Sequence, residues 1–192
     1  MNGIPDWELV DRARSGDVDA FAELVRRYQG PVIHFCQRMT GSLEQAEDLA
    51  QDSFIRVYRY LGRLRPDAKF STVLFGMARN LTLNHLRDTA RRGRGRTRSL
   101  TRADEREGAV PDESGRPDRV ARLREIESAI ERALGQLSPE HREVLVLREL
   151  HGLDYDAIGQ IVKCRRGTVK SRLARAREQL RAKLIELGGE LL

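Results

Sequence analysis

The positively charged side chains of this sequence are concentrated near its C-terminal end. Nine lysines and arginines lie between Lys163 and Lys183, against one acid, Glu178. Apolar residues recur there at three- and four-residue steps, namely Val169, Leu173, Ala176, Leu180 and Leu184. This spacing predicts an amphipathic helix with one apolar stripe and an otherwise cationic surface. Because such cationic groups bind phosphates, the segment is a candidate nucleic-acid contact.

A second helix is predicted just before the basic one, over residues 155–162. The turn between them, residues 163–167, contains a glycine, and Thr168 is expected to cap the basic helix. This order is typical of a helix-turn-helix, which offers the first turn of its second helix to base edges in a DNA major groove. A solvated basic face on a bundle helix is the alternative. It leaves the preceding helix and turn unexplained, so DNA binding is favoured.

Composition supports a polyanionic partner. The 192 residues include 35 Lys and Arg against 29 Asp and Glu, a formal net charge of +6.

The only cysteines, Cys36 and Cys164, are too far apart in sequence to suggest a disulfide framework. We therefore expect a protein of a reducing compartment, in which both cysteine side chains pack against their neighbours. Since no apolar run reaches signal or membrane-spanning length, we expect a soluble, cytoplasmic protein without membrane insertion.

The first half of the chain predicts helices only. Trp7, Leu9 and Val10 give the first helix its apolar side, and Ser42 and Gln45 form a capping box. We expect helices over residues 6–15, 17–39 (interrupted at Gly30 and Pro31), 43–61 and 71–90, with a loop over residues 62–69.

The composition then changes at residue 91. Residues 91–98 hold five arginines and two glycines, and polar residues with Pro and Gly follow. We expect a flexible charged linker over residues 91–118. A further helix begins near Arg119, with Val120, Leu123, Ile126, Ile130 and Leu134 as its core stripe. Since no strand pattern occurs, the fold class is all-α: two small helical domains, residues 1–90 and 119–192, joined by this linker, with the helix-turn-helix in the second.

Both domains resemble one family. The strings AEDLAQDSFIRVYRYL (46–61), KFSTVLFGMARNLTLNHLR (69–87), LSPEHREVLVLRELHGLDYDAIGQIV (137–162) and GTVKSRLARARE (167–178) are similar, in this order, to bacterial RNA polymerase sigma factors of the extracytoplasmic-function (ECF) group. The resemblance implies a transcription initiation factor that is not an enzyme and needs no cofactor or metal. It also implies that the first domain binds polymerase core and opens the downstream (-10) promoter element, and that the second reads the upstream (-35) element.

The resemblance also implies roles for individual residues. It implies that the acidic face of the helix over residues 43–61 contacts the clamp helices of the largest polymerase subunit. The residues expected to make this contact are Glu47, Asp48, Gln51, Asp52, Phe54 and Arg56. Downstream DNA contacts fall to Leu64, Lys69, Phe70, Phe75, Arg79, Asn80 and Arg87. Upstream DNA contacts fall to Arg165, Arg166, Thr168, Lys170, Ser171, Arg172, Ala174 and Arg175.

Asn80 matches the family position that helps to form a pocket for an unstacked base, and its amide can pair with a base edge. Four positions depart from the family. Val73 stands where tryptophan is usual, and Leu64 stands in a loop where an aromatic is common. Ala157 and Gly159 replace a usual glutamate and a usual alanine, and Gly159 should weaken its helix by about 1 kcal/mol relative to alanine.

Other classes of protein explain less of the sequence. A free-standing repressor or activator would use the helix-turn-helix but leave the acidic helix without a role. An enzyme is disfavoured because no phosphate loop, metal-ligand spacing or nucleophile motif occurs. A purely protein-binding adaptor would not need the basic helix. The resemblance leaves open a further partner, an anti-sigma protein, whose target would be an apolar groove between the two domains.

Overall fold

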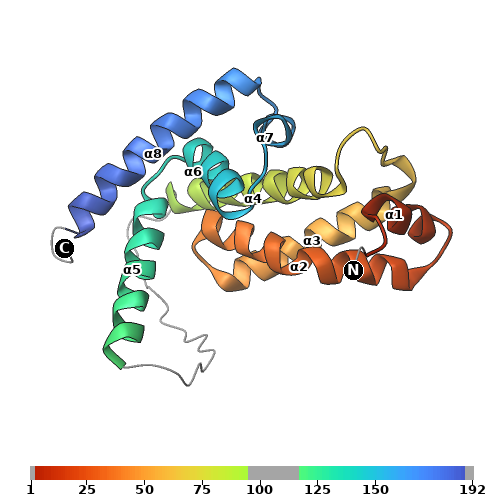
Figure 1. Cartoon of the computed structure of the whole chain (residues 1–192), viewed down its shortest axis with the longest axis horizontal. Helices are drawn as coiled ribbons and strands as arrows, with labels where there is room; N and C mark the ends of the chain where they lie inside the picture. The colour runs from red at the N-terminus through yellow and green to blue at the C-terminus, as the bar shows by residue number, and fades with distance from the viewer. Residues whose placement is uncertain (1–2, 95–116, 189–192) are drawn as a thin grey trace.

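The computed structural model describes residues 3–94 and 117–188, and within them every regular element is helical (Figure 1). The elements of the first unit are α1 (Asp6–Arg14), α2 (Val18–Thr40), α3 (Leu43–Tyr60), the 3-10 turn η1 (Leu61–Arg63) and α4 (Phe70–Arg94). Those of the second unit are α5 (Pro117–Gly135), α6 (Pro139–Leu145), the π-helical turn η2 (Val146–Leu150), α7 (Tyr155–Val162) and α8 (Arg166–Gly188). The all-α prediction is confirmed.

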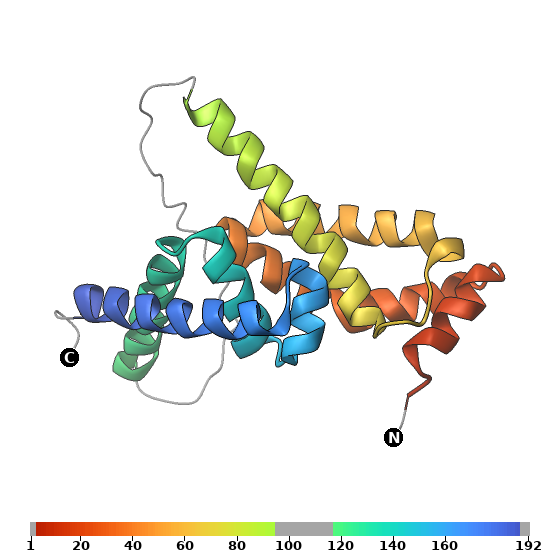
Figure 2. The same cartoon turned by 90° about the horizontal axis from the view of Figure 1, so that it is seen from above.

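In the first unit, α2 and α3 lie side by side and α4 packs against both (Figures 1 and 2). Gly41 takes a left-handed conformation (φ 78°) at the end of α2, and the Ser42 hydroxyl accepts a hydrogen bond from Gln45 N, as the capping box predicts. The predicted interruption at Gly30 and Pro31 is wrong, because α2 runs through both. Pro31 lacks the N–H of its turn, but buried side chains on both sides, such as Leu24 and Val32, hold the helix together.

In the second unit, α8 packs on α5, α6 and α7 through its predicted apolar stripe. Val169, Leu173 and Ala176 are fully buried, so this stripe is confirmed. The stripe predicted for α5 is partly wrong: Leu123 and Ile126 are 58% and 44% exposed. The N-terminal half of α5 extends past the helices that bury its C-terminal half (Figure 1).

The two units pack against each other instead of standing apart. Helix α7 and the turn η2 lie along α4 and α2, and α5 and α6 contact α2 (Figure 2). The predicted linker over residues 91–118 is also shortened at both ends, since α4 continues to Arg94 and α5 begins at Pro117. The rest of that predicted segment, residues 95–116, lies outside the described residues.

Candidate nucleic-acid interface

The helix-turn-helix is built by local signals and one close backbone approach. Asp154 caps α7 by accepting a hydrogen bond of 2.8 Å from Ala157 N. Lys163 ends it in a left-handed conformation, with φ of 57°. The turn then folds back so closely that a Cβ added to Gly159 would lie 2.8 Å from the carbonyl oxygen of Cys164. Gly159 therefore has a packing role beside its low helix propensity, because a larger residue would press against the turn.

Helix α8 begins at Arg166, three residues before the start at Val169 that a cap at Thr168 implies. The Arg165 carbonyl accepts its first hydrogen bonds, from Thr168 N at 2.8 Å and Val169 N at 3.1 Å. Thr168 therefore lies in the first turn and is not the cap, which corrects the prediction. Arg165, Arg166 and Thr168 are all exposed at this end of the helix.

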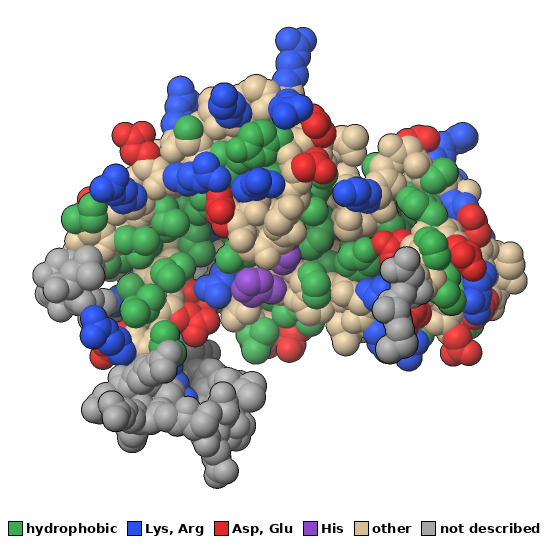
Figure 3. Space-filling view, viewed as in Figure 1, with side chains coloured by type: hydrophobic (Ala, Val, Ile, Leu, Met, Phe, Trp, Pro, Cys, Tyr) green, Lys and Arg blue, Asp and Glu red, His purple; other side chains and the backbone are tan. Residues whose placement is uncertain are grey.

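The residues predicted to read the upstream element share an exposed face of α8. Lys170, Ser171, Ala174 and Arg175 are all exposed, opposite the buried stripe. Figure 3 shows Lys and Arg side chains along this helix. Arg172 differs, because it turns toward α6: its Nη2 lies 3.0 Å from Glu140 Oε2 and its Nη1 3.9 Å from Glu143 Oε1.

The predicted downstream residues are divided between surface, core and inter-unit contact. Phe70 and Phe75 are 1% and 3% exposed, so neither ring is free to contact a base in this arrangement. Phe70 packs with Trp7 and Tyr28 at centroid distances of 6.3 and 5.5 Å, because its ring closes the core of the first unit.

The polar downstream residues are distributed differently. Arg79 donates two hydrogen bonds to Glu143 of the second unit, and its side chain is 14% exposed. Asn80 is half-buried beside it. Lys69 and Arg87 are exposed, and Leu64 is half-buried.

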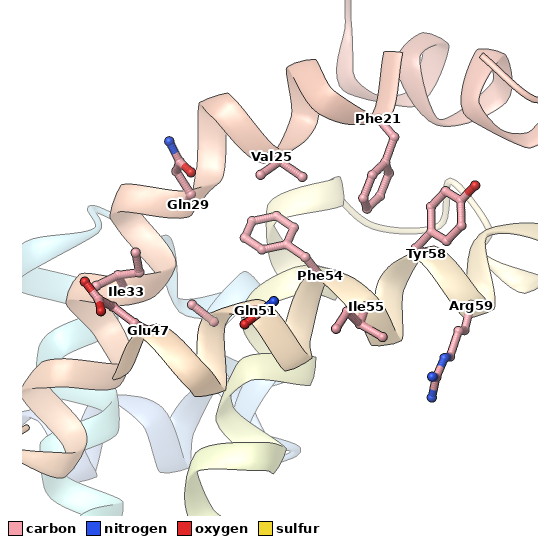
Figure 4. A pocket seen from close by; sticks show the side chains of 11 residues that line it. Phe21, Val25, Gln29, Ile33, Glu47, Gln51, Phe54, Ile55, Tyr58 and Arg59 are labelled. Carbon is pink, nitrogen blue, oxygen red and sulfur yellow. The ribbon is translucent and has the colours of Figure 1, made fainter. Parts of the chain in front are cut away.

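The predicted polymerase-binding residues lie on α3, beside a groove. Glu47, Asp48, Gln51, Asp52 and Arg56 are exposed, whereas Phe54 is 7% exposed and lies beneath them. A groove of about 520 Å³ between α2 and α3 is lined by Phe54 together with residues the sequence did not single out, mainly Phe21, Val25, Ile55 and Tyr58 (Figure 4). Ile55 and Tyr58 are 41% and 51% exposed, a signal that only the fold makes visible.

Glu143 is the residue of greatest consequence that the sequence did not single out. It is fully buried in α6, yet two arginines of the predicted DNA-binding sets face it. Burial raises the pKa of its carboxyl, and the hydrogen bonds and charge of Arg79 oppose that shift. Among the described residues, no group of three or more His, Cys, Asp or Glu side chains could hold a metal ion.

Comparison with known proteins agrees with this organisation. Residues 24–92 match the family Sigma-70 region 2, and residues 127–180 match Sigma-70, region 4. The RNA polymerase sigma-H factor of Pseudomonas aeruginosa is 37% identical over 179 residues, which cover 91% of either chain. The ECF RNA polymerase sigma factor SigW of Bacillus subtilis is 34% identical over 188 residues, which cover 93% of this chain and 96% of SigW.

Two solved structures share the fold. CnrH in complex with the cytosolic domain of CnrY has a TM-score of 0.64 at 27% identity, covering 93% of this chain and 96% of CnrH. The sigma factor RpoE in complex with the anti-sigma factor NepR, from Bartonella quintana, has a TM-score of 0.68 at 22% identity, covering 87% of this chain and 98% of RpoE.

A helix-turn-helix whose second helix has a basic exposed face, preceded by an all-helical unit, is typical of DNA-binding proteins that act in transcription. The chain belongs to the sigma-70 family of RNA polymerase sigma factors, in its ECF group, and is thus a transcription initiation factor and not an enzyme. The family resemblance read from the sequence is confirmed. Within residues 3–94 and 117–188, no helix has the length and apolar character needed to cross a membrane.

Proposed function

We propose that the chain acts in the cytoplasm as a sigma factor that reads the -35 element with α8 and opens the -10 element with α4, after binding polymerase core through α3. The observation that supports this most strongly is the placement of these three surfaces. The basic face of α8, the polar residues of α4 and the acidic face of α3 lie on separate helices, so one chain can hold polymerase and DNA at once.

The α3 surface suits a helical partner that carries basic residues. Its exposed acids, Asp48 and Asp52, are one turn apart, and the apolar groove with Ile55 and Tyr58 lies beside them. Apolar anchors surrounded by charged groups are typical of a protein-binding surface. We assign this surface to the clamp helices of the largest polymerase subunit, the contact that the family resemblance implies.

The α8 surface suits direct reading of duplex DNA. Lys170, Ser171, Ala174 and Arg175 project from one face and can reach base edges, while Arg165 and Arg166 at the start of the helix suit phosphates. A single helix of this size buries little surface, so its affinity alone is low. Specific binding therefore depends on polymerase to supply the rest of the interface.

For strand opening, we assign Asn80 to an unstacked base of the -10 element and Lys69, Arg79 and Arg87 to its phosphates. The Asn80 amide has donors and an acceptor for a base edge. An anti-sigma protein is a further proposed partner, because CnrH, at 27% identity, is known in complex with the cytosolic domain of CnrY.

Transcription in vitro from a random promoter library tests this function. Polymerase core is supplied with the wild-type chain or with no sigma factor, and the transcribed templates are sequenced. We expect that, only when the chain is present, the transcribed promoters have in common one upstream and one downstream sequence element. Transcripts without any shared element, or none above the core-only control, would refute the proposed function.

A further inference from the structure

The α3–α4 loop, residues 61–69, is fastened to the first helix of the chain. This loop carries Leu64 and Lys69 of the predicted downstream set, and it lies beside α1 in both views of the fold (Figures 1 and 2). The side chains of α1 that hold it are 47 to 61 residues away from their partners along the chain. The shape of the loop therefore depends on where the folded first unit places α1.

Arg14, the last residue of α1, holds the first part of the loop. Its Nε donates a hydrogen bond of 2.8 Å to the Leu61 carbonyl oxygen, and its Nη2 donates another to the Leu64 carbonyl oxygen. Its Nη1 lies 2.5 Å from Asp11 Oδ1, which orients the guanidinium. Because a guanidinium is a rigid planar fork, its two donors fix the two carbonyls relative to each other. Arg14 thereby fixes the turn η1 and the residue that follows it.

Trp7, on the same helix, holds the last part of the loop. Its indole Nε1 donates a hydrogen bond of 2.9 Å to the carbonyl oxygen of Ala68. Its ring packs edge-on against Phe70, the first residue of α4, with the ring centroids 6.3 Å apart. The loop is thus pinned on both sides of residues 65–67, which form a short exposed arch.

Helix α1 can serve as a fixed support because it is itself firmly packed. Leu9 and Val10 on its inner side are buried in the core of the first unit. At the start of α1, Asp6 accepts hydrogen bonds from Arg27 Nη1, at 3.1 Å, and from the Tyr28 hydroxyl, both on α2. The anchors of the loop are therefore tied to the longest packed pair of helices in this unit through α2.

The support also decides which side chains of the loop face solvent. Leu64 is half-buried and packs against the core, whereas Arg63, Arg65 and Lys69 are exposed. Three cationic side chains on one short loop suit the phosphates of a single DNA strand. Because the loop is fastened on both sides of its arch, it presents these groups in one arrangement before DNA binds, which lowers the entropy lost on binding.

We propose that α1 sets the base preference at the downstream element by holding the α3–α4 loop in one conformation, with Arg14 and Trp7 as positioning residues. Each acts through a carbonyl of the loop and not by touching DNA. Flexible loops that can re-pack accept several ligands, so release of the loop should let it accommodate other bases. The inference rests on the proposed function, since it takes residues of this loop as DNA contacts.

The experiment compares Arg14→Ala and Trp7→Phe with a matched control, Arg12→Ala. Arg14→Ala removes the fork, whereas Trp7→Phe keeps an aromatic ring but removes the N–H donor. Arg12 lies on the same helix, but its Nε and Nη2 donate to Asp17 and not to the loop, so its substitution removes the same charge and one surface ion pair. Arg14→Lys keeps the charge without the fork, which separates positioning from attraction of phosphates.

Two measurements on the full-length chain give the readout, after circular dichroism has shown which variants are folded. With polymerase core, transcription is measured from promoters of the transcribed library in which each base of the downstream element, and in parallel of the upstream element, is varied in turn. Without core, acrylamide quenching of Trp7, the only tryptophan of the chain, reports whether the loop still covers its anchor. Should Arg14→Ala fail to fold, Arg14→Lys and Trp7→Phe carry the same comparison.

We expect Arg12→Ala to keep the base preference of wild type. The ratio between the preferred downstream base and its best alternative should fall about tenfold in Arg14→Ala and about threefold in Trp7→Phe, as loss of two hydrogen bonds or one allows. Arg14→Lys should resemble Arg14→Ala, both should raise the quenching of Trp7, and upstream preferences should stay unchanged.

An unchanged downstream preference in Arg14→Ala and Trp7→Phe would overturn the inference. So would a loss of transcription that is equal for all bases, or a wild-type preference in Arg14→Lys, because either result would make Arg14 a structural residue or a phosphate contact. Failure of the proposed function is seen separately, as absence of promoter-specific transcription by the wild-type chain. The quenching measurement then still shows whether Arg14 holds the loop.

Discussion

The tight turn of the helix-turn-helix makes Gly159→Ala a sharp test of the packing described above. In an ordinary helix interior, alanine stabilises by about 1 kcal/mol relative to glycine. At this position the added Cβ would lie 2.8 Å from the carbonyl oxygen of Cys164, below the 3.4 to 4 Å of ordinary contact. That atom is backbone, and Cys164 N donates to the Gly159 carbonyl at 3.0 Å, so moving the turn would also disturb this hydrogen bond.

Overpacking of this kind costs about 1 to 3 kcal/mol. Set against the gain in helix propensity, the expected result is a net destabilisation of about 1 kcal/mol, or a fall in Tm of about 2 to 4 °C for a chain of this size. The assay is thermal unfolding of the full chain followed by far-ultraviolet circular dichroism.

Gly76→Ala is the matched control. Gly76 also lies inside a helix, α4, but a Cβ there would meet no atom within 4 Å. We expect this substitution to stabilise by about 1 kcal/mol. If Gly159→Ala raises Tm as much as Gly76→Ala does, the close approach to Cys164 imposes no constraint and the packing argument is wrong.

Four further outcomes are expected. Asp48→Arg with Asp52→Arg should weaken core binding in a pull-down titration without lowering Tm, because both are exposed; unchanged affinity would remove the α3 assignment. Arg175→Ala should cost about 1 to 3 kcal/mol on the preferred upstream sequence, and an equal loss on all sequences would make it a phosphate contact. Asn80→Ala should leave closed-complex formation intact but slow strand opening, read by permanganate reactivity of thymines; a normal rate would remove the base-binding role of Asn80. Finally, the contact of His151 with the first unit should weaken as pH falls from 6.5 toward 4, because burial, and then the nearby charge of His34, lower the pKa of His151 from its ordinary 6.5 to about 4. The stability that the neutral imidazole gives to this contact is fully present above pH 6.5 and is lost as His151 becomes protonated. His34 shifts in the same direction through burial and then Arg38, with Glu127 and Glu131 opposing. The Tm of the wild-type chain should therefore fall over this pH range, and the Tm of a His151→Gln chain should fall less; an equal fall in both would remove His151 as the cause.

The sequence predicts best what is decided locally. Helix α7 has both of the predicted ends, Tyr155 and Val162, because the apolar spacing and the turn residues after it lie within one short segment. The cap at Ser42 follows from four adjacent residues. Pro31 misleads for the opposite reason: its cost to α2 is real, but burial of side chains in neighbouring turns outweighs it, and burial depends on the whole fold.

The inter-unit contact had no sequence signal. Glu143 reads as an ordinary surface acid, and its partner Arg79 is 64 residues away. Burial and ion pairing between distant residues depend on how the units dock, which periodicity within either unit does not report. The same holds for Leu123 and Ile126, whose helical spacing predicts burial although their side chains are 58% and 44% exposed.

One binding measurement decides whether this sigma factor reads promoters only as part of a polymerase complex. A duplex promoter fragment chosen from the transcribed library is titrated with the full-length chain, alone and with polymerase core, beside a scrambled duplex of the same length. We predict specific binding only when core is present, with the free chain binding both duplexes weakly and equally. Tight, sequence-specific binding by the free chain would show that polymerase is not needed, and would favour a free-standing DNA-binding regulator.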